Sequence, residues 1–250
     1  VERSRGLGDV YKRQDLHHTE TRLLPADKRT YDEPYFAKRN PGVSAVLLTL
    51  GVRGALLPQL AHHNLLFSRE WGTDFDAVFD GPVDARPLGA SRSIYVSKPS
   101  ATDPGTAPEG HENLFVLVPV PAQTDVGGGD AYGGGASTSV EAIADAALTQ
   151  IAEWCGIPDL RERIVVHKTV GPADFADRYR AWSGGAIGPA HTLRQSAFLR
   201  GRNASRTLED LYYAGATTVP GVGVPMCLIS AENVVKRLRG DKSSGPLPTT

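Results

Sequence analysis

The chain has 250 residues, a length that indicates one large domain or two interleaved ones. Its 27 Lys and Arg residues nearly balance its 28 Asp and Glu residues, and the net charge of −1 argues against a nucleic-acid partner. No apolar run approaches the roughly 18 residues of a membrane-spanning helix. The two cysteines, Cys155 and Cys227, lie in no metal-ligand spacing, so no metal site is predicted. No secretory signal is evident, which favours a cytoplasmic location.

The two ends differ from the rest of the chain. Residues 1–14 show no clear hydrophobic period and resemble a translated cloning adaptor, so we expect them to be a non-native leader. The sole methionine is Met226, and we therefore expect the chain to be the carboxyl-terminal part of a longer protein. Residues 241–250 are rich in Ser, Pro and Gly, a composition that predicts a disordered tail.

Between these ends, the apolar pattern predicts a sheet with a few helices. The continuous apolar run at 43–52 predicts a strand buried on both faces, although a helix also fits its periodicity. The remaining predicted elements are strands at 62–68, 93–97, 112–120 and 164–166, and helices at 70–79 and 174–182. Strands with few helices between them predict a mixed or antiparallel sheet, so we assign the chain to the α/β class, of the α+β mixed kind.

A glycine tract at 125–137 separates the predicted strands from a long helix. None of its windows matches G-x-G-x-x-G, and we favour a flexible surface insertion over a phosphate cradle. Thr138 and Glu141 then form a predicted capping box, and Gly156 supplies a left-handed stop. The apolar residues of this helix recur at helical spacing, namely Val140, Ile143, Ala147, Ile151 and Trp154.

The segment at 211–239 predicts a short strand, a glycine-rich turn and a helix. The strand covers 211–214, the turn contains Gly215, Gly221 and Gly223, and Pro225 suits the first helical turn. The unpaired amides of such a helix start suit a phosphate or a developing anion, but a plain strand-to-helix turn fits equally well. The apolar residues Leu228, Ala231, Val235 and Leu238 line one face of this helix.

Residues 211–234, LYYAGATTVPGVGVPMCLISAENV, closely resemble the carboxyl-terminal flavin motif of bacterial-type phytoene desaturases. These enzymes belong to the carotenoid and retinoid oxidoreductase family. Four further segments carry the resemblance in the family's order over nearly all of residues 15–240: 15–25, 50–68, 94–121 and 184–200. The resemblance implies an FAD-dependent enzyme that desaturates a long polyene, as in the conversion of phytoene to a lycopene-type product.

The resemblance also implies a fold and a domain organisation. The fold would be an incomplete glutathione-reductase-like FAD/NAD(P)-binding fold with a mixed-sheet substrate domain. Residues 15–42 would be a returning segment of the FAD domain, 43–205 the substrate domain, and 206–240 the carboxyl-terminal FAD-binding strand-turn-helix. The dinucleotide-binding G-x-G-x-x-G motif is not found in the chain. We therefore expect residues 1–250 alone neither to hold FAD tightly nor to turn over.

The flavin motif implies cofactor-binding residues around the glycine-rich turn. Backbone amides at Gly223, Val224 and Met226 would face the N1/C2-carbonyl edge of the flavin, where negative charge grows on reduction. Gly215 and Ala216 would approach the ribityl chain or the pyrophosphate. Ala216 stands where many related flavoproteins have an acid, so that side-chain hydrogen bond is not available. The expected cofactor-binding set is Gly215, Ala216, Gly221, Gly223, Val224, Pro225 and Met226.

Other polar residues are weaker candidates, and no catalytic residue is assigned. His191 and Gln195 follow the glycine turn at 184–185 and are expected to line the flavin cavity. His62 and His63 are candidates for the edge of the substrate channel, although a structural histidine pair is the favoured interpretation. Arg200 and Arg202 fit a phosphate contact and simple solvation equally well. No G-x-S-x-G motif is present, so a hydrolase triad has no support.

A long polyene is held in bilayers, so we expect the complete protein to associate peripherally with a membrane. No amphipathic anchor stands out in the sequence. Alternatives within the same fold are a C30 desaturase, a hydroxycarotenoid dehydrogenase, a ketolase and a retinol saturase-like enzyme. An alternative from another class is a non-catalytic flavin-fold scaffold in a pigment-synthesising assembly.

Overall fold

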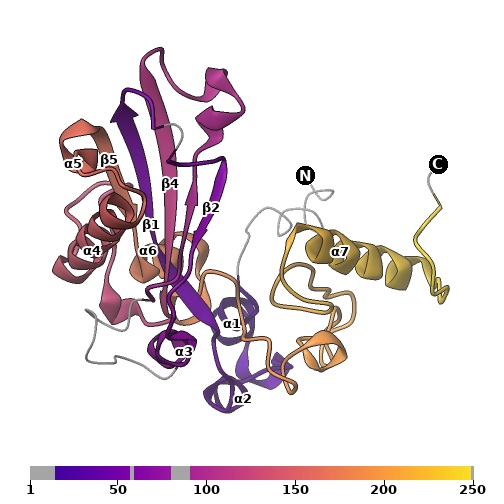
Figure 1. Cartoon of the computed structure of the whole chain (residues 1–250). Helices are drawn as coiled ribbons and strands as arrows, with labels where there is room; N and C mark the ends of the chain where they lie inside the picture. The colour runs from indigo at the N-terminus through magenta and orange to yellow at the C-terminus, as the bar shows by residue number, and fades with distance from the viewer. Residues whose placement is uncertain (1–14, 57–58, 80–90, 249–250) are drawn as a thin grey trace. The chain divides into compact units, whose positions relative to one another are not determined.

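The computed structural model of the chain describes residues 15–56, 59–79 and 91–248, which form two compact units (Figure 1). The first unit combines residues 15–42 and 187–248 with Asp177–Trp182. The second unit combines the described residues of Val43–Ala176 with Ser183–Ala186. Residues 187–205 thus group with the first unit, whereas the sequence prediction grouped them with the sheet. The predicted leader at 1–14 lies outside the described residues.

The second unit is built on one five-stranded sheet of strand order β2-β3-β4-β1-β5. The strands are β1 (Val43–Arg53), β2 (His63–Leu66), β3 (Ile94–Ser97), β4 (His111–Pro121) and β5 (Ile164–Val170). Every pairing is antiparallel, so the mixed sheet was wrong and the antiparallel alternative is confirmed. The sequence offers few of the long helical crossovers that parallel pairs require, which accounts for this outcome.

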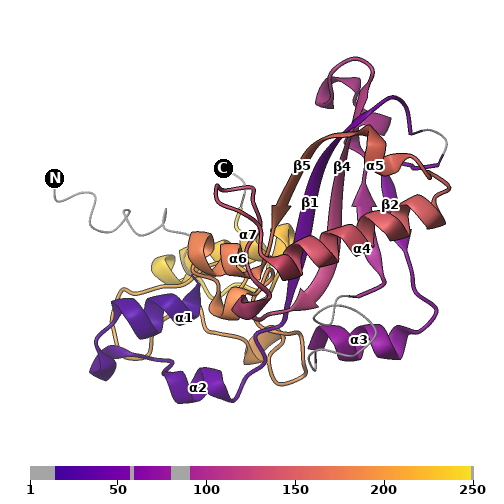
Figure 2. The same ribbon diagram turned by 90° about the vertical axis from the view of Figure 1, so that its left-hand side faces the viewer.

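The core of this unit lies between the sheet and helix α4 (Thr138–Trp154), which crosses one face of the sheet (Figure 2). Strand β1 was predicted to be buried on both faces, but its residues alternate in burial: Val46 and Leu48 are buried, whereas Thr49 is exposed. Strand β4 alternates in the same way and pairs with β1 along its whole length. The apolar side chains of α4 close the core, among them Val140, Ile143, Ala147 and Ile151.

Helix α4 begins one residue earlier than the predicted capping box requires. Ser137 is the N-cap, and its hydroxyl accepts a hydrogen bond from Val140 N at 3.3 Å. Ser137 has extended backbone angles, while Thr138 is already helical, so Thr138 cannot cap the helix. Gly156 has φ +66° and follows the end of the helix as predicted.

The glycine tract before α4 packs against the sheet, so the flexible insertion was wrong for residues 127–131. Gly129 N donates to Asp174 Oδ2 at 2.7 Å, and Asp130 Oδ1 accepts from Thr169 N at 2.7 Å. A Cβ on Gly129 would lie 2.0 Å from Thr169 O, so only glycine allows this approach to β5. Glycine here serves close backbone contact, which composition alone does not distinguish from flexibility.

Three shorter helices belong to this part of the chain: α3 (Trp71–Phe79), α5 (Leu160–Arg163) and α6 (Pro172–Tyr179). In the first unit, α1 (Leu16–His18) continues into a π-helical turn at Thr19–Leu23, and α2 (Glu33–Ala37) and α7 (Val224–Arg239) follow. The 3₁₀ turns are Ala26–Lys28, Pro99–Ala101, Pro104–Thr106, Thr124–Val126, Trp182–Gly184 and Ala197–Leu199. The predicted strand at 211–214 is reduced to an isolated bridge between Tyr212 and Ala204.

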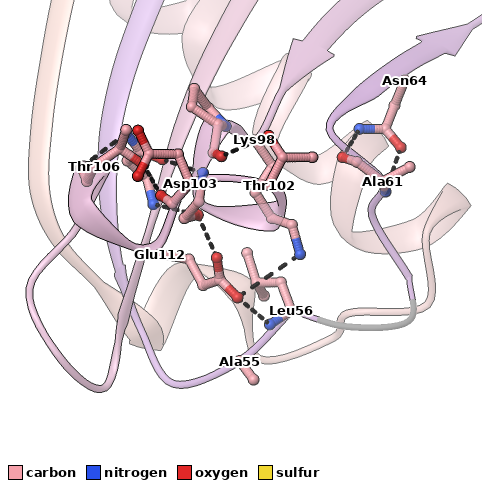
Figure 3. A network of polar contacts seen from close by, with 12 residues as sticks. Ala55, Leu56, Ala61, Asn64, Lys98, Thr102, Asp103, Thr106 and Glu112 are labelled. Atoms are coloured by element: carbon pink, nitrogen blue, oxygen red, sulfur yellow. Dashed lines mark hydrogen bonds and ion pairs between the residues drawn. The ribbon is translucent and has the colours of Figure 1, made fainter.

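A polar network joins three segments at one end of the sheet (Figure 3). Lys98 directly follows β3 and is fully buried, with its Nζ 3.7 Å from Glu112 Oε1 in β4. Glu112 also accepts hydrogen bonds from Ser100 Oγ and, at 3.5 Å, from Leu56 N. Within the described residues, Lys98 Nζ has no hydrogen-bond partner besides this ion pair. The network fixes the loop after β3 to the ends of β1 and β4.

Candidate functional site

The start of helix α7 presents backbone donors that the helix does not use. Cys227 N is bonded to Gly223 O at 2.9 Å, which leaves the amides of Gly223, Val224 and Met226 without an intrahelical partner. Pro225 has no N–H to satisfy. No side chain from the described part of the chain caps this end. The helix dipole adds partial positive charge, so the position favours an anion or a polarised oxygen.

The turn before α7 is open on the side of two glycines. Gly215 has φ +121° and Gly223 has φ +109°, conformations that side-chain-bearing residues rarely adopt. Among the described residues, no heavy atom lies within 4 Å of a Cβ built on either glycine. At Gly215 and Gly223, the described side chains therefore leave the backbone of the turn uncovered.

The turn is held from behind by a buried amide and two hydroxyls. Asn203 Nδ2 lies 3.0 Å from both Tyr213 O and Ser230 Oγ. Ser230 Oγ accepts from Gly215 N at 3.1 Å, and Thr218 Oγ1 donates to Gly215 O at 3.1 Å. Asn203, Thr218 and Ser230 are all at most 2% exposed. These bonds tie the glycine turn to the second turn of α7 and fix its backbone.

Arg200 supports the same turn through hydrogen bonds to backbone carbonyls. Its side chain is buried, with Nε donating to Ala216 O at 2.9 Å. Nη1 donates to Pro189 O at 2.9 Å and to Gln195 O at 3.2 Å. Arg200 therefore joins the loop at 189–195 to the residue after Gly215. Arg202, the second arginine considered from the sequence, is exposed.

His191 lies beside the turn, whereas Gln195 is used within the fold. A Cβ on Gly221 would lie 3.3 Å from His191 Cε1, so the imidazole rests against that glycine. Burial, together with the charge of Arg200, lowers the pKa of His191. The Gln195 amide bonds to both backbone groups of Asn40 and to Ala190 O, which leaves it no hydrogen for a ligand.

The apolar residues at the start of α7 face outward. Val224 is 77% and Leu228 is 67% exposed, and Met226 also borders solvent. On the apolar face of α7, Leu228, Ala231 and Leu238 are exposed and Val235 is half-buried, so the described residues leave most of this face uncovered. Ser230 is the buried residue of this helix in the described structure. The site thus combines free peptide donors with apolar surface.

His62 and His63 belong to the second unit, at the start of β2. His62 Nδ1 lies 2.6 Å from Thr102 Oγ1, and His63 Nδ1 lies 2.7 Å from Tyr95 OH. The two rings lie 4.1 Å apart. Both side chains thus have hydrogen-bond partners within the fold, as a structural pair would. Across the described ranges, no group of three or more His, Cys, Asp or Glu side chains is placed to hold a metal ion.

Sequence reasoning missed the residues that support the turn. No sequence feature pointed to a structural role for Asn203, which is 2% exposed. Ser230 stands in an otherwise apolar stretch of the predicted helix, which is a signal for a buried hydrogen bond. Arg200 was considered, but nothing local to it indicates burial.

The chain is similar to curated carotenoid desaturases. It is 42% identical over 234 residues to the carotenoid 3,4-desaturase of Haloarcula japonica, a match that covers 93% of this chain and 44% of that protein. It is 34% identical over 225 residues to a 4,4'-diapophytoene desaturase (4,4'-diaponeurosporene-forming) of Staphylococcus aureus, covering 89% and 43% of the two chains. No protein-family model matches the chain. The chain thus spans less than half the length of these relatives.

Proposed function

The homologues of this chain are carotenoid desaturases, and on that premise we propose that it forms part of an FAD-dependent enzyme that desaturates a long polyene. The observation that carries the proposal is the start of α7, where the amides of Gly223, Val224 and Met226 have no partner among the described residues and lie beside an open turn. The relatives connect the chain to desaturation of carotenoids, and this geometry supports a cofactor site within it.

The residues present fit the edge of a flavin. Gly215 and Gly223 leave the backbone accessible, and the free donors at the positive end of α7 suit a ring carbonyl. Arg200 brings a buried cation with one unpartnered nitrogen, Nη2, next to this backbone. Every element of the set belongs to the first unit.

FAD held at this turn would supply the hydride-accepting chemistry that desaturation of a polyene requires. The amides of Gly223, Val224 and Met226 would hold the flavin edge on which negative charge develops, at no cost of reorganisation during the reaction. The fixed turn supplies the preorganisation, since Asn203 and Ser230 hold its backbone. Val224 and Met226 would exclude water from the ring and offer apolar contact to a hydrocarbon.

The names of the relatives bear on the substrate. One is named a carotenoid 3,4-desaturase and the other a 4,4'-diapophytoene desaturase, so phytoene and 4,4'-diapophytoene are the two substrates to compare. We propose that 4,4'-diapophytoene is not the preferred substrate, because the relative with 42% identity is named a carotenoid 3,4-desaturase. Feeding phytoene and 4,4'-diapophytoene separately to the complete protein, and recording product absorption spectra, tests this choice.

The flavin site itself is tested by a pair of glycine substitutions in the complete protein. Gly223→Val would strain a backbone with φ +109° and place a branched side chain over the free amides. Gly240→Val is the matched control, because Gly240 also has positive φ and open surroundings but ends the same helix. We expect Gly223→Val to lose FAD, measured by flavin absorbance per protein, and Gly240→Val to keep it. Stoichiometric FAD in Gly223→Val would reject this site.

Peripheral membrane association is part of the proposal, because the substrate is a bilayer hydrocarbon. In the structure, no described helix has both the length and the apolar character to cross a membrane. A row of exposed aromatic rings begins just before α3, continues along that helix and supports surface docking: Phe67, Trp71, Phe75 and Phe79, each 41–55% exposed. Successive ring centroids lie 5.2, 6.4 and 6.1 Å apart. The sequence analysis had found no such anchor.

The neighbouring residues Glu70, Asp74 and Asp76 are acidic, so we propose uncharged rather than anionic lipid as the docking surface. Flotation of the complete protein with phosphatidylcholine vesicles tests this. Replacing both Trp71 and Phe75 with Ser should lower the vesicle-bound fraction several-fold. Val165→Ser removes a similarly exposed apolar residue from β5 and should leave binding unchanged. Equal losses in both variants would contradict docking through α3.

A further inference from the structure

We propose that Arg200 is a positioning residue that favours the reduced form of the flavin, by holding an unneutralised positive charge beneath the glycine turn. This inference rests on the proposed function. In the proposed function the backbone amides bind the flavin ring. The inference adds that the Arg200 side chain sets the affinity for the reduced ring.

The first observation is that Arg200 is buried but not fully paired. Its side chain is 4% exposed, and Nε and Nη1 donate to three backbone carbonyls. Nη2 has no hydrogen-bond partner among the described residues. A buried charged donor without a partner is destabilising, so its retention indicates a use for the charge beyond local packing.

The second observation is where the guanidinium lies. Its Nη2 is 3.6 Å from a Cβ built on Gly188, and its Cδ is 4.0 Å from a Cβ built on Gly221. The charge of Arg200 also acts on His191, and Cys227 in the first turn of α7 acts on Arg200. Arg200 therefore lies against the turn that leads into α7. This turn receives positive potential both from the side chain and from the helix start.

The third observation is that this charge lacks a firm counter-ion. The acid that acts on Arg200 in the described structure is Asp15, and no ion pair joins the two. Burial raises the pKa of Asp15, and its oxygens accept hydrogen bonds from His17 N and Trp182 N instead. A cavity of about 10 Å³ lies between Asp15 and Arg200, enough for about one water molecule. Within the described residues, no ion pair therefore neutralises the guanidinium.

An uncompensated cation at a helix start that also lacks an acidic cap would repel another cation and attract an anion. A phosphate would normally pair with arginine through direct, bidentate contact. Arg200 cannot make such contact, because backbone carbonyls occupy two of its nitrogens and the side chain is buried. Its influence is therefore through space, in a low-dielectric setting, on charge that develops beyond the turn. Negative charge on the reduced flavin fits this requirement.

Three substitutions in the complete protein test the inference. Arg200→Gln removes the charge, Arg200→Lys keeps it, and Arg202→Gln is the control at an exposed arginine two residues away. The measurement is the dissociation constant of FAD in the oxidised and in the reduced state. We expect Arg200→Gln to weaken binding of reduced FAD about tenfold more than binding of oxidised FAD, which lowers the two-electron midpoint potential by about 30 mV.

Arg200→Lys and Arg202→Gln should keep the ratio of the two dissociation constants close to that of the unsubstituted protein. Equal weakening of both states in Arg200→Gln would overturn the inference and point to pyrophosphate or to structure alone. If Arg200→Gln retains no FAD, the ratio of the two dissociation constants is compared between Arg200→Lys and the unsubstituted protein. Because lysine keeps the positive charge, a tenfold change in that ratio would reject a role for the charge. If the unsubstituted protein binds no FAD, the proposed function itself fails.

A second readout needs no flavin. The charge of Arg200 contributes to the lowered pKa of His191. In Arg200→Gln, the pKa of His191, followed by NMR titration of its ring protons, should rise toward its ordinary value of 6.5. It should stay lowered in Arg202→Gln. An unchanged value in Arg200→Gln would show that the guanidinium does not act at the turn.

Discussion

Tyr213 OH donates a hydrogen bond to Glu20 Oε1 at 2.5 Å, across 193 residues of sequence. Glu20 is fully buried, and its second oxygen accepts from Thr30 N at 2.7 Å and from Tyr31 N at 3.2 Å. One carboxyl group thus ties the described start of the chain to the residue that enters the glycine turn. The turn is therefore placed by a long-range contact as well as by Asn203 and Ser230.

Tyr213→Phe should destabilise the protein and change how its stability depends on pH. Burial, with the bond to Glu20, raises the pKa of Tyr213 above its ordinary value of 10.0. The folded state then holds this proton more tightly than the unfolded state. The stabilisation is complete below about pH 10 and is lost as the pH rises further.

Urea unfolding checks both effects. At neutral pH, Tyr213→Phe should lower the free energy of unfolding by about 1.5–3 kcal/mol, the range for hydrogen bonds to charged groups. Above about pH 10, its stability should decline less steeply than that of the unsubstituted protein. Parallel declines of the two proteins at alkaline pH would contradict the assignment to Tyr213.

Asn203 and Ser230 should behave as one coupled unit. Asn203→Ala removes an amide shared among Tyr213 O, Val219 O and Ser230 Oγ, and should lower the free energy of unfolding by about 2 kcal/mol. Ser230→Ala frees Gly215 N and should have a smaller effect. The double variant, measured by thermal unfolding, should be about 1 kcal/mol more stable than the summed losses of the two single variants predict. Simple additivity would mean that the two side chains act independently.

Removing one member of the Lys98–Glu112 pair should be far worse than removing both. Glu112→Leu leaves the Lys98 ammonium buried and unpaired, and should cost about 3–5 kcal/mol of stability. The double variant Lys98→Met, Glu112→Leu contains no buried charge and should recover most of that loss. The urea midpoint of the two variants gives the comparison. A double variant as unstable as Glu112→Leu would show that the pair is needed for packing of the loop.

Two glycines of the same tract should respond oppositely to alanine. In Gly129→Ala the new Cβ would lie 2.0 Å from Thr169 O and 2.6 Å from Val170 N, which forces the backbone apart. We expect a loss of about 3 kcal/mol or more. Gly135→Ala meets nothing within 4 Å among the described residues and should be neutral or slightly stabilising. Similar melting temperatures for the two variants would mean that residues 127–131 do not pack as described.

The sequence was sufficient for the elements of the sheet and for the position of the glycine turn. Strands β1 and β4 follow directly from apolar runs bounded by Pro and Gly, and α4 follows from its helical period. The start of α7 was also predictable, because Gly223 and Pro225 have the conformational preferences of a helix N-terminus. These features depend on neighbours within a few residues, which a sequence displays.

Tertiary structure alone decided which side chains are buried and what they contact. Leu228 and Leu238 belong to the apolar face that the sequence of α7 displays, yet both are exposed, whereas Ser230 is buried. Arg200 is buried because carbonyls of residues 189, 195 and 216 converge on it, and Gly129 is packed because β5 passes beside it. The partners in each case lie elsewhere in the chain. Residue type and periodicity report local preference, whereas burial and pairing depend on which distant segments the fold brings together.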